Sequence, residues 1–463
     1  MYVLGLDTRI TTVSVSMKVS VRIHIEDGYE AGAVTGVVFV DLSAVYDTVN
    51  IRRLLWKVSK LTHDRKFVGI LGELLHNRRF QVHLQSGQSR WRKLRNGLPQ
   101  GSVLAPTLFN IYTNDQPQPP NTTSFIYADD LALAAQAKSF EVVETYLSAA
   151  LEDLDIYYRE NALKPNPAKT QSCAYHLRNR MANRKLDVVW RGVRITHTDC
   201  PKYLGITLDR SLTYKTNCEN VKKKVFSRNN LLRRLTTSKS GAAPNVLRIT
   251  GLALCFSAGE YACPVWGRST HSKGVDVALN ETCRIITGCL KPTPVQMLYP
   301  LAGIAPPAVR RNVAASLEKM RQETDHRHPL HGARPPRSRL KSRNSFLASV
   351  APVKDAPKTR IEQWEELALP DFLPPVERLP PGYDQPWPVW KYLNRLRAQV
   401  GRCRENLCKW GDTDDNSCGC GAIPQTMRHL LCCPLCPDSC IVENLYNATD
   451  NAVCVAKYWA SKI

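Results

Sequence analysis

Hydrophobic and polar positions in the first half of the chain follow the patterns of a mixed helix and strand fold. Residues 35–49, TGVVFVDLSAVYDTV, open with a β-branched and aromatic run that predicts a buried strand ending at Asp41. Residues 124–135, SFIYADDLALAA, predict two strands joined by a tight turn at Asp129 and Asp130. Ionised carboxylates are expensive to bury in a core, so these three aspartates need another explanation.

Helical spacing predicts two helices around these strands. In residues 96–115, NGLPQGSVLAPTLFNIYTND, a Gly- and Pro-containing turn precedes an apolar stripe of Leu104, Leu108 and Ile111. From Phe140 to about Asn161 the stripe is Leu147, Leu151, Leu154 and Tyr158. The KPNP sequence at 164–167 ends that helix, and residues 169–177 predict another strand. This order predicts an α+β fold, an antiparallel sheet with helices on one face.

The second half of the chain has a different character. Residues 217–300 are predicted to be mostly helical, with basic stretches such as VKKKVFSRNNLLRRL. Residues 321–360 are rich in Pro, Arg, Lys, Ser and His with little apolar periodicity, which is typical of a mobile basic linker. A second Pro-rich stretch extends to about residue 388, and a compact Cys-rich segment follows.

Charge and cysteine usage narrow the class of protein. The net charge of +22 favours a polyanionic partner, nucleic acid rather than an acidic membrane surface. No long apolar run and no leader pattern is present, so we expect no membrane span and an intracellular location. A location in the nucleus would be compatible with this expectation. The sixteen cysteines should then be mostly reduced. Seven precede residue 400 and nine follow it, which indicates a C-terminal metal site rather than a disulfide framework.

The three aspartates of the predicted sheet suggest a metal site of another kind. If their strands are neighbours, Asp41 meets Asp129 and Asp130 at one edge. Clustered carboxylates repel one another unless cations lie among them, and hard oxygen ligands suit Mg²⁺. Two such ions about 4 Å apart would hold the attacking and leaving oxygens of a phosphoryl transfer.

Five stretches together resemble a known family. FVDLSAVYDTVN, NGLPQGSVLAPTLFNIYTND, FIYADDLAL, LKPNPAKTQ and PKYLGITLD are similar to successive palm motifs of reverse transcriptases, most closely those of jockey-like non-LTR retrotransposons of the LINE group. The resemblance runs from about residue 26 to the C-terminal cysteines. It implies a right-hand polymerase palm that carries out RNA-directed DNA synthesis from an RNA template, a DNA primer and deoxynucleoside triphosphates.

The resemblance also implies roles for single residues. Asp41 and Asp129 would hold two Mg²⁺ ions with help from Asp130, and Lys169 would protonate the leaving pyrophosphate. The nucleotide site would be lined by Leu42, Tyr46, Gln100 and Gly101, with Tyr46 as the steric gate against ribonucleotides. The primer grip would consist of Tyr203, Leu204 and Gly205. Alternatives remain: Tyr46 as a core aromatic, Lys169 as a surface lysine, and Asp47 as a cap of the following helix.

The C-terminal sequence CGCGAIPQTMRHLLCCPLC has zinc-ligand spacing. Its candidate ligands are Cys418, Cys420, His429 and Cys433, where Cys432 or Cys436 could replace Cys433. The resembled family carries a Cys-Cys-His-Cys element at this place, so a zinc knuckle that binds RNA or DNA is expected, and a reduced Cys-rich helix pair is the alternative. The HRHPLH sequence at 326–331 is interpreted as a solvated loop rather than a metal site.

These interpretations divide the chain into five parts. Residues 1–25 are a degenerate N-terminal remnant without fingers motifs, 26–210 the palm with partial fingers, 211–320 a helical thumb or connector, 321–388 the linker, and 389–463 the zinc-knuckle-like module. Because the fingers motifs are missing, the main alternative to an active polymerase is an inactive relic that only binds nucleic acid. An RNA-dependent RNA polymerase and a non-enzymatic zinc-dependent binding protein are weaker alternatives.

Overall fold

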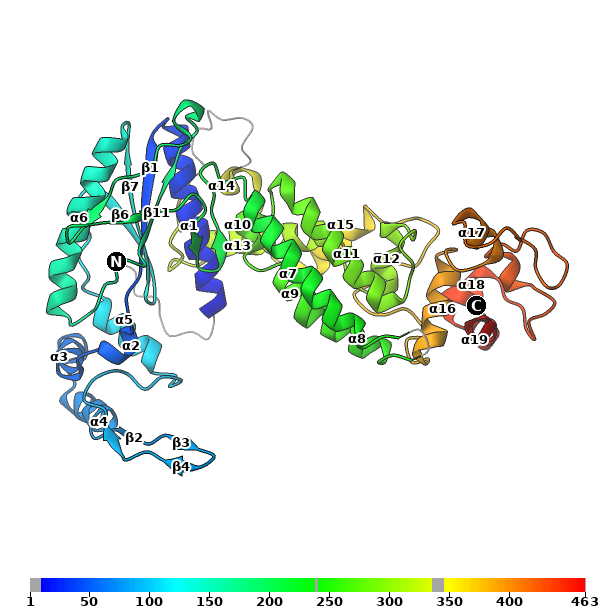
Figure 1. The fold of residues 1–463 in the computed structure, drawn as a ribbon, viewed down its shortest axis with the longest axis horizontal. Coiled ribbons are helices and arrows are strands. Elements are labelled where there is room, and N and C mark those ends of the chain that lie inside the picture. Colours follow the sequence, from blue (N-terminus) through cyan, green and yellow to red (C-terminus); the bar gives the residue numbers. More distant parts are fainter. Residues whose placement is uncertain (1–9, 238–239, 335–344, 463) are drawn as a thin grey trace. The chain divides into compact units, whose positions relative to one another are not determined.

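The computed structural model describes residues 10–237, 240–334 and 345–462, with the side chains of 10–13 left out, and the chain forms two compact units. The first unit runs to Tyr214 and includes Arg321–Val350, and the second comprises Lys215–Met320 and Ala351–Ile463. The first unit contains the predicted palm, and the second contains the predicted helical segment together with the Cys-rich module (Figure 1).

The first unit begins with a long helix and a strand, continues through several helices and short hairpins, and ends with the remaining strands of its sheet and a long helix between them. Its helices are α1 Ile10–Glu30, α2 Val45–Thr48, α3 Ile51–Thr62, α4 Arg65–Leu75, α5 Ala105–Thr113, α6 Phe140–Glu160, η1 Asn179–Met181 and α14 Phe346–Ser349. Its longer strands are β1 Val34–Val40, β6 Thr122–Tyr127, β7 Asp130–Ala137 and β8 Gln171–Tyr175. Its two-residue strands are β2 Arg79–Phe80, β3 His83–Leu84, β4 Gly87–Gln88, β5 Arg92–Lys93, β9 Val189–Trp190, β10 Val193–Arg194, β11 Thr196–His197, β12 Lys202–Tyr203 and β13 Ile206–Thr207.

A five-stranded sheet of order β11-β8-β1-β7-β6 forms the centre of this unit. Strands β1, β6, β7 and β8 pair in antiparallel fashion, and β11 joins β8 in parallel. The predicted strand, hairpin, helix and strand are therefore present in the predicted order, and the α+β class is confirmed.

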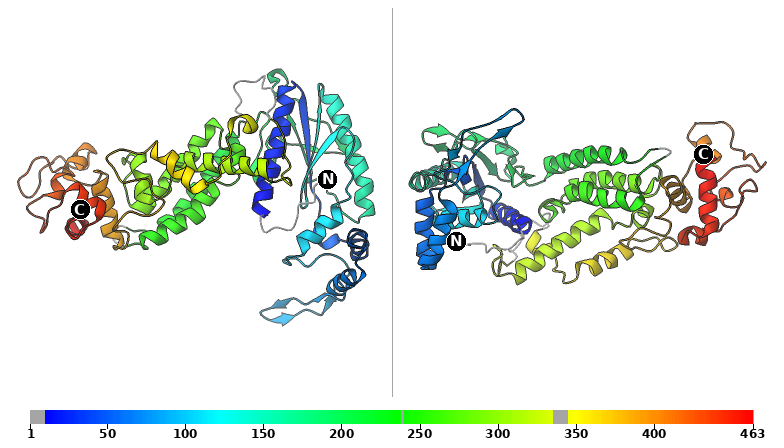
Figure 2. Two further views of the ribbon diagram at one scale, coloured as in Figure 1. Left: turned by 180° about the vertical axis from the view of Figure 1, so that it is seen from behind. Right: turned by 90° about the horizontal axis from the view of Figure 1, so that it is seen from below.

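Helices lie against both faces of the sheet (Figures 1 and 2). Gly36 faces α6, because a Cβ at this position would approach the side chains of Val143 and Leu147. The opposite face is covered by α1, where the amide of Gln136 on β7 donates a 2.6 Å hydrogen bond to the His24 carbonyl. The sequence analysis placed helices on one face alone; the additional helix comes from residues interpreted there as a remnant.

The formation of α1 runs against its sequence pattern. Residues 13–25 alternate strictly between apolar and polar, which is the pattern of a half-buried strand. In the helix most of these side chains are buried, including Lys18 and Arg22. Each finds a partner four residues away, since Lys18 Nζ donates to Ser14 Oγ at 2.7 Å and Arg22 Nε to Glu26 Oε1 at 2.7 Å. Such pairs meet on a helix and not on a strand.

The second unit is helical, as predicted for residues 217–300. Its elements are α7 Lys215–Arg233, α8 Pro244–Gly251, the π-helical turn η2 Leu252–Phe256, α9 Ser257–Gly259, α10 Cys263–Trp266, η3 Thr270–Ser272, α11 Lys273–Thr287, α12 Val295–Ala302, α13 Pro307–Thr324, α15 Ala356–Glu365, α16 Trp387–Arg397, α17 Arg404–Lys409, η4 His429–Leu431, α18 Val442–Asn447 and α19 Asp450–Lys462. In none of the described helices is there a stretch long and apolar enough to cross a membrane.

Two parts of the predicted division contain structure that the sequence did not indicate. The linker of residues 321–388 includes α14 and α15, and Trp364 on α15 is only 1% exposed, so its described part is not devoid of structure. The Cys-rich module has its own core around Leu393, Leu445 and Trp459, but α16 also joins it to the preceding helices. The Trp390 indole N–H, for instance, donates to the Ile286 carbonyl on α11 at 3.1 Å.

Candidate active site and metal-ligand cluster

The end of β1 and the start of β7 bring carboxylates to one place. Val40 pairs with Leu131, so Asp41, which follows β1, stands opposite Asp130. Both side chains lie on the face away from α6, because Val40 and Leu131 contribute to the core that α6 covers. Asp129 occupies the turn between β6 and β7 next to them.

The hairpin turn carries strain and a perturbed carboxyl group. Ala128 has a φ of 53°, a left-handed conformation that is costly for a residue with a Cβ. Desolvation of the Asp130 carboxyl raises its pKa above the ordinary value, and the charges of Asp129 and Asp41 raise it further. Asp129 and Asp130 are exposed and Asp41 is half-buried, so a cation can approach these carboxylates from solvent.

The loop of residues 164–170 holds the main chain of Asp41. The Asp41 N–H donates to Thr170 Oγ1 at 3.2 Å, and the Asn166 N–H donates to the Asp41 carbonyl at 2.9 Å. Leu42 forms a β-bridge with Pro165 in the same loop. Lys169 is exposed, and its N–H is bonded to the Asn166 carbonyl at 3.1 Å, so its side chain extends from a loop anchored to Asp41.

Tyr46 lies beside the carboxylates at the start of α2. Its ring packs against Phe109 of α5 with centroids 5.0 Å apart. Burial raises the pKa of Tyr46, and the charge of Asp129 adds to this effect. The ring is half-buried against the core, as the core-aromatic alternative expected, and the role of steric gate stays a prediction.

The loop before α5 is tied to the segment after β1. The Gln100 side-chain amide donates a 3.0 Å hydrogen bond to Asp47 Oδ1, and Gln100 and Gly101 are exposed. Asp47 lies inside α2 and does not cap the following helix α3; Asn50 does, by accepting a 3.1 Å hydrogen bond from the Arg53 N–H. The capping alternative for Asp47 was therefore wrong.

The predicted primer grip is a two-residue hairpin turn. Leu204 and Gly205 connect β12 and β13 with φ values of 44° and 84°. Tyr203 is buried, and its ring lies 5.3 Å from that of Phe39, which stands near the end of β1 on the same face as Asp41. This hairpin thus borders the same face of the sheet as the carboxylates.

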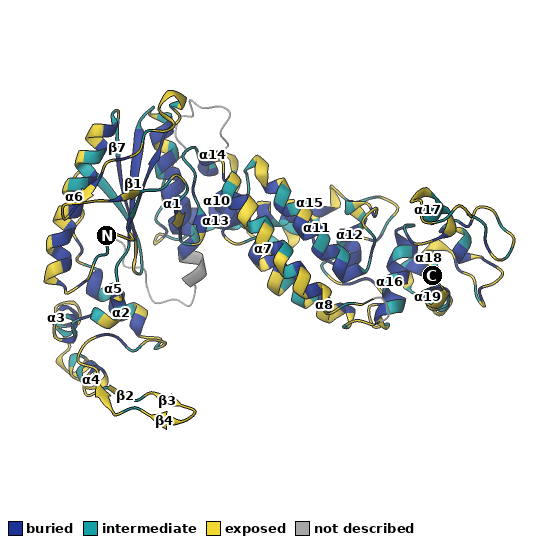
Figure 3. Ribbon diagram, viewed as in Figure 1, coloured by how far each residue is buried: buried dark blue, intermediate teal, exposed yellow. Residues whose placement is uncertain are grey.

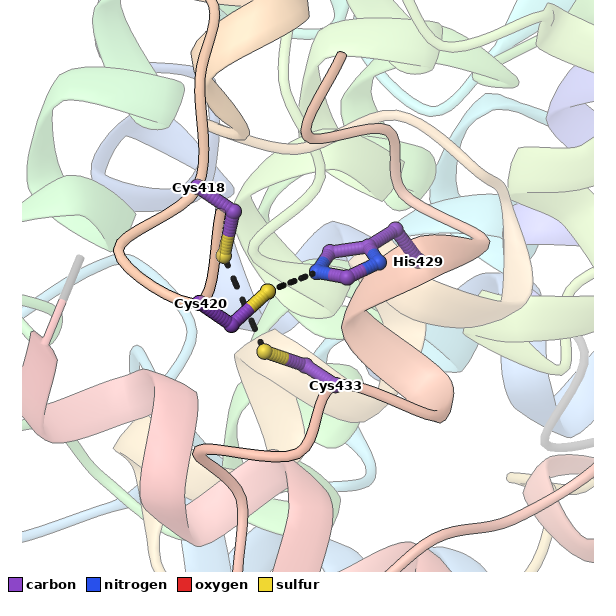
Figure 4. Close-up of side chains that lie close together, drawn as sticks. All are labelled: Cys418, Cys420, His429 and Cys433. Carbon is purple, nitrogen blue, oxygen red and sulfur yellow. Dashed lines mark hydrogen bonds between the residues drawn. The ribbon is translucent and has the colours of Figure 1, made fainter. Parts of the chain in front are cut away.

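The four expected ligands of the Cys-rich module converge (Figure 4). The Sγ atoms of Cys418, Cys420 and Cys433 and a ring nitrogen of His429 all lie within 4.8 Å of one another. Cys418 Sγ is 3.7 Å from Cys433 Sγ, and Cys420 Sγ is 3.3 Å from His429 Nε2. Three thiols and one imidazole in one group are the donor set of a structural Zn²⁺ site.

A polar contact supports this group from outside. Gln425 Nε2 donates to Cys418 Sγ at 3.1 Å, while Gln425 Oε1 accepts from the Arg404 N–H at 3.0 Å. Burial opposes ionisation of Cys418, but hydrogen bonds from the Cys420 backbone and the side chains of Gln425 and His429 prevail and lower its pKa to about 6. Burial raises the pKa of Cys433 to about 11.

The other candidates lie outside the group. Cys432 is exposed and its thiol turns to the His429 carbonyl, and Cys436 is buried elsewhere in the core of the module. In the 326–331 loop, His328 is buried and its Nδ1 accepts from the Leu330 N–H, which is a local structural contact. The supporting roles of Thr170, Asn166 and Gln425 were missed, because single polar residues carry no spacing signal.

Comparison of the sequence with known proteins shows which proteins this chain is similar to. Residues 12–208 match the family described as reverse transcriptase (RNA-dependent DNA polymerase). The chain is 29% identical over 276 residues to a probable RNA-directed DNA polymerase from transposon BS of Drosophila melanogaster, covering 58% of this chain and 30% of that protein. It is 27% identical over 265 residues to the RNA-directed DNA polymerase from mobile element jockey of the same organism, covering 54% and 28%.

One similarity extends into the C-terminal module. A putative 115 kDa protein in the type-1 retrotransposable element R1DM of Drosophila melanogaster is 23% identical over 441 residues, which cover 90% of this chain and 41% of that protein. Apo telomerase from Candida tropicalis is a weak structural neighbour, with a TM-score of 0.35, 11% identity and coverage of 58% of this chain and 45% of that one, and carries no weight here.

Residues 12–208 are a reverse transcriptase domain. Its homologues are the RNA-directed DNA polymerases of non-LTR retrotransposons, as the sequence motifs predicted. The chain spans less than half the length of the curated relatives that it matches.

Proposed function

We propose that this chain is an RNA-directed DNA polymerase that extends a DNA primer along an RNA template with deoxynucleoside triphosphates. One observation carries the proposal: Asp41 and Asp130 stand opposite each other at the end of β1 and the start of β7, with Asp129 in the adjoining turn. Asp129 and Asp130 are exposed and Asp41 is half-buried, and carboxylates that repel one another beside a strained turn are suited to hold divalent cations, here two Mg²⁺ ions.

Bound Mg²⁺ would stabilise the charge that develops on the attacking and leaving oxygens during nucleotidyl transfer. The chain's own residues position the reactants. Tyr46, whose ring packs against Phe109, would limit the space at the sugar of the incoming nucleotide. Gln100 is oriented by Asp47, and Lys169 extends from the loop anchored to Asp41, where its ammonium could neutralise or protonate pyrophosphate. Leu42 and Gly101 would complete the nucleotide site.

The hairpin of Tyr203, Leu204 and Gly205 would support the primer end, since it borders the same face as Asp130. The exposed lysines of α7, at positions 223 and 224, would contact phosphates of the template–primer duplex without reading its sequence. In the C-terminal module, Cys418, Cys420, His429 and Cys433 would hold Zn²⁺ and stabilise a small nucleic-acid-binding element. A nuclear location would suit synthesis at chromosomal DNA.

Primer extension by the purified chain tests the proposal. The assay contains an RNA template, a DNA primer, deoxynucleotides and Mg²⁺, and it compares the wild type with Asp129→Asn/Asp130→Asn. Because these substitutions keep side-chain shape and remove the charges, template–primer binding should survive while extension is lost by at least about a thousandfold.

Three results would count against the proposal. Extension by the double variant at the wild-type rate would mean that the carboxylates do not hold the catalytic ions. No extension by the wild type, with template–primer binding intact, would make the chain the binding-competent relic considered above. Efficient use of ribonucleotides by the wild type would favour the RNA polymerase alternative.

A further inference from the structure

A hairpin between α4 and α5 carries concentrated positive charge. We define the basic hairpin as residues 78–95, which include β2, β3, β4 and β5 and project away from the sheet (Figures 1 and 2). It contains six Arg and Lys residues, and no acidic residue occurs between Glu73 and Asp115. Its strands are almost entirely exposed (Figure 3).

Like charges face each other across the hairpin. Arg79 on β2 pairs directly with Lys93 on β5, so their side chains share one face. Like charges at directly opposed positions destabilise a strand pair, and this pair consists of only two residues on each strand. The arrangement therefore costs stability in the free protein, and a polyanion on this face would remove the cost.

Aromatic rings accompany the charges. Trp91 is 59% exposed and Phe80 is 40% exposed, far more than rings that serve a core. The Arg79 guanidinium lies 5.1 Å from the centroid of the Trp91 ring, so Trp91 belongs to the face that carries Arg79 and Lys93. Exposed rings between cations are the surface on which unpaired bases stack, whereas the bases of a duplex are not accessible to them.

The base of the hairpin is attached to the candidate active site. The Arg78 guanidinium donates to the Leu75 carbonyl at 3.0 Å, to the Asn96 carbonyl at 3.2 Å, and to the Gly97 carbonyl. The Gly97 N–H donates to the Val49 carbonyl at 2.8 Å. Hydrogen bonds therefore connect the base of the hairpin to the segment after β1 and to the loop that contains Gln100.

We propose that the basic hairpin binds the single-stranded RNA template ahead of the active site, with bases stacking on Trp91 and phosphates contacting Arg79 and Lys93. The choice of the RNA template as the bound nucleic acid rests on the proposed function. A second copy of the chain is a poorer occupant of the exposed apolar surface, because two hairpins with the same strong positive charge repel each other.

Fluorescence anisotropy with the full chain tests this without catalysis. One probe is a labelled RNA–DNA duplex with blunt ends, and the other is the same duplex with a 5′ RNA overhang of about ten nucleotides, within the range that single-strand grooves accommodate. The wild type should bind the overhang probe at least about tenfold more tightly than the blunt probe.

Three variants separate the contributions. Trp91→Ala should reduce the affinity for the overhang probe by about tenfold and leave the blunt probe unchanged. Arg79→Gln/Lys93→Gln should weaken overhang binding and lower its salt slope by about 1.4, since single-strand contacts contribute about 0.7 each. Arg180→Gln/Lys185→Gln removes two exposed charges elsewhere in the same unit and should leave the preference for the overhang intact.

Several results would overturn the proposal. The first is that the wild type binds both probes with the same affinity. The second is that the hairpin variants lose affinity for both probes to the same extent, and the third is that they bind the overhang probe as tightly as the wild type does. Sedimentation of the wild type as a dimer that Trp91→Ala disrupts would assign the surface to a second copy. Because binding is measured without nucleotides, an inactive polymerase with a clear overhang preference would refute the proposed function and leave this inference standing.

Discussion

The ammonium of Lys57 on α3 lies 2.6 Å from Asp115 Oδ1, just beyond α5, and is buried while the carboxylate is half exposed. Lys57 Nζ also donates to the Tyr112 carbonyl at 2.6 Å and to Asn161 Oδ1 at 2.7 Å. One buried cation thus fastens α3 and α5 to the end of α6. These are the helices that flank Tyr46 and the loop with Gln100, so the network holds the candidate nucleotide site in shape.

Breaking this pair from its two ends should have unequal effects. Asp115→Asn leaves a buried ammonium without its counter-charge and should lower the free energy of unfolding by about 3 kcal/mol. Lys57→Met leaves a carboxylate that water can reach and an unpaired Asn161 oxygen, so we expect a smaller loss of about 1–2 kcal/mol. Urea unfolding of both variants and of the double variant measures the difference, and a larger loss in Lys57→Met would contradict the buried-cation account.

Two glycines of one loop provide a matched test of close packing. Gly97 and Gly101 have similar φ values of 86° and 82°. A Cβ at Gly97 would lie 2.9 Å from the Asp47 Cα and carbonyl oxygen, whereas nothing lies within 4 Å of a Cβ at Gly101. Both Ala variants suffer the backbone strain, about 1 kcal/mol, but Gly97→Ala must also displace the backbone beside Tyr46.

We therefore expect Gly97→Ala to lower the thermal unfolding midpoint clearly more than Gly101→Ala does. Differential scanning calorimetry on the two proteins decides the matter. Equal midpoints would mean that the loop does not contact the segment after β1 as closely as the distances indicate.

The C-terminal ligand group makes a prediction about metal content. Zinc measured by mass spectrometry should be one equivalent for the wild type and for Cys432→Ser, and should be lost in Cys418→Ser. Chelation should loosen the region of residues 400–440, as hydrogen exchange would detect, without affecting the sheet. Retained zinc in Cys418→Ser, or loss in Cys432→Ser, would require a different ligand set.

The sequence predicted those helices and strands whose pattern of apolar and polar residues is complete within a single segment. The apolar run before Asp41, the hairpin around Asp129 and the helical stripe from Phe140 each encode their own element by periodicity. The placement of β1 between β7 and β8 depends on pairings between distant segments, and no local pattern reports it. The carboxylate group could be predicted because three aspartates stand at the ends of apolar strands, and the resemblance to a known family added the roles of single residues.

Tertiary contacts overrode the local pattern at α1. The alternation of residues 13–25 favours a strand, yet burial as a helix is compensated by pairs such as Lys18 with Ser14. The role of Arg78 could not be predicted either. Its partner carbonyl at Asn96 lies 18 residues away in the sequence and comes close only in the folded chain. Short exposed strands such as β2 and β5 also lack the apolar alternation by which strands are found.

His24 on α1 predicts a loss of stability in mild acid. Burial lowers its pKa from the ordinary value of 6.5 to about 4, and its Nε2 finds no hydrogen-bond partner in the described part of the chain. As the pH falls from about 6.5 toward 4, the unfolded chain binds a proton that the folded chain excludes, so the folded state is progressively destabilised. The slope from His24 is at most about 1.4 kcal/mol per pH unit.

His24→Phe should flatten this dependence, because the new ring packs against Phe125 and does not titrate. His176, whose pKa burial and the nearby Arg210 and Arg178 lower to about 4, remains as a second contributor. Unfolding midpoints at pH 7 and pH 5 for both proteins give the comparison. A variant with the same pH dependence as the wild type would show that His24 is solvated.

Tyr46 makes the sharpest prediction about substrate choice. Its ring is held by Phe109 beside the carboxylates, so shortening it should open space at the sugar of the incoming nucleotide. Tyr46→Ala should raise the use of ribonucleotides relative to deoxynucleotides by at least about tenfold, whereas Tyr46→Phe, which keeps the ring and loses only the hydroxyl, should discriminate as the wild type does. The measurement is the ratio of kcat/KM for the two nucleotide classes in single-nucleotide primer extension. If Tyr46→Ala keeps the wild-type ratio while losing stability, the ring is a core residue alone and the gate lies elsewhere.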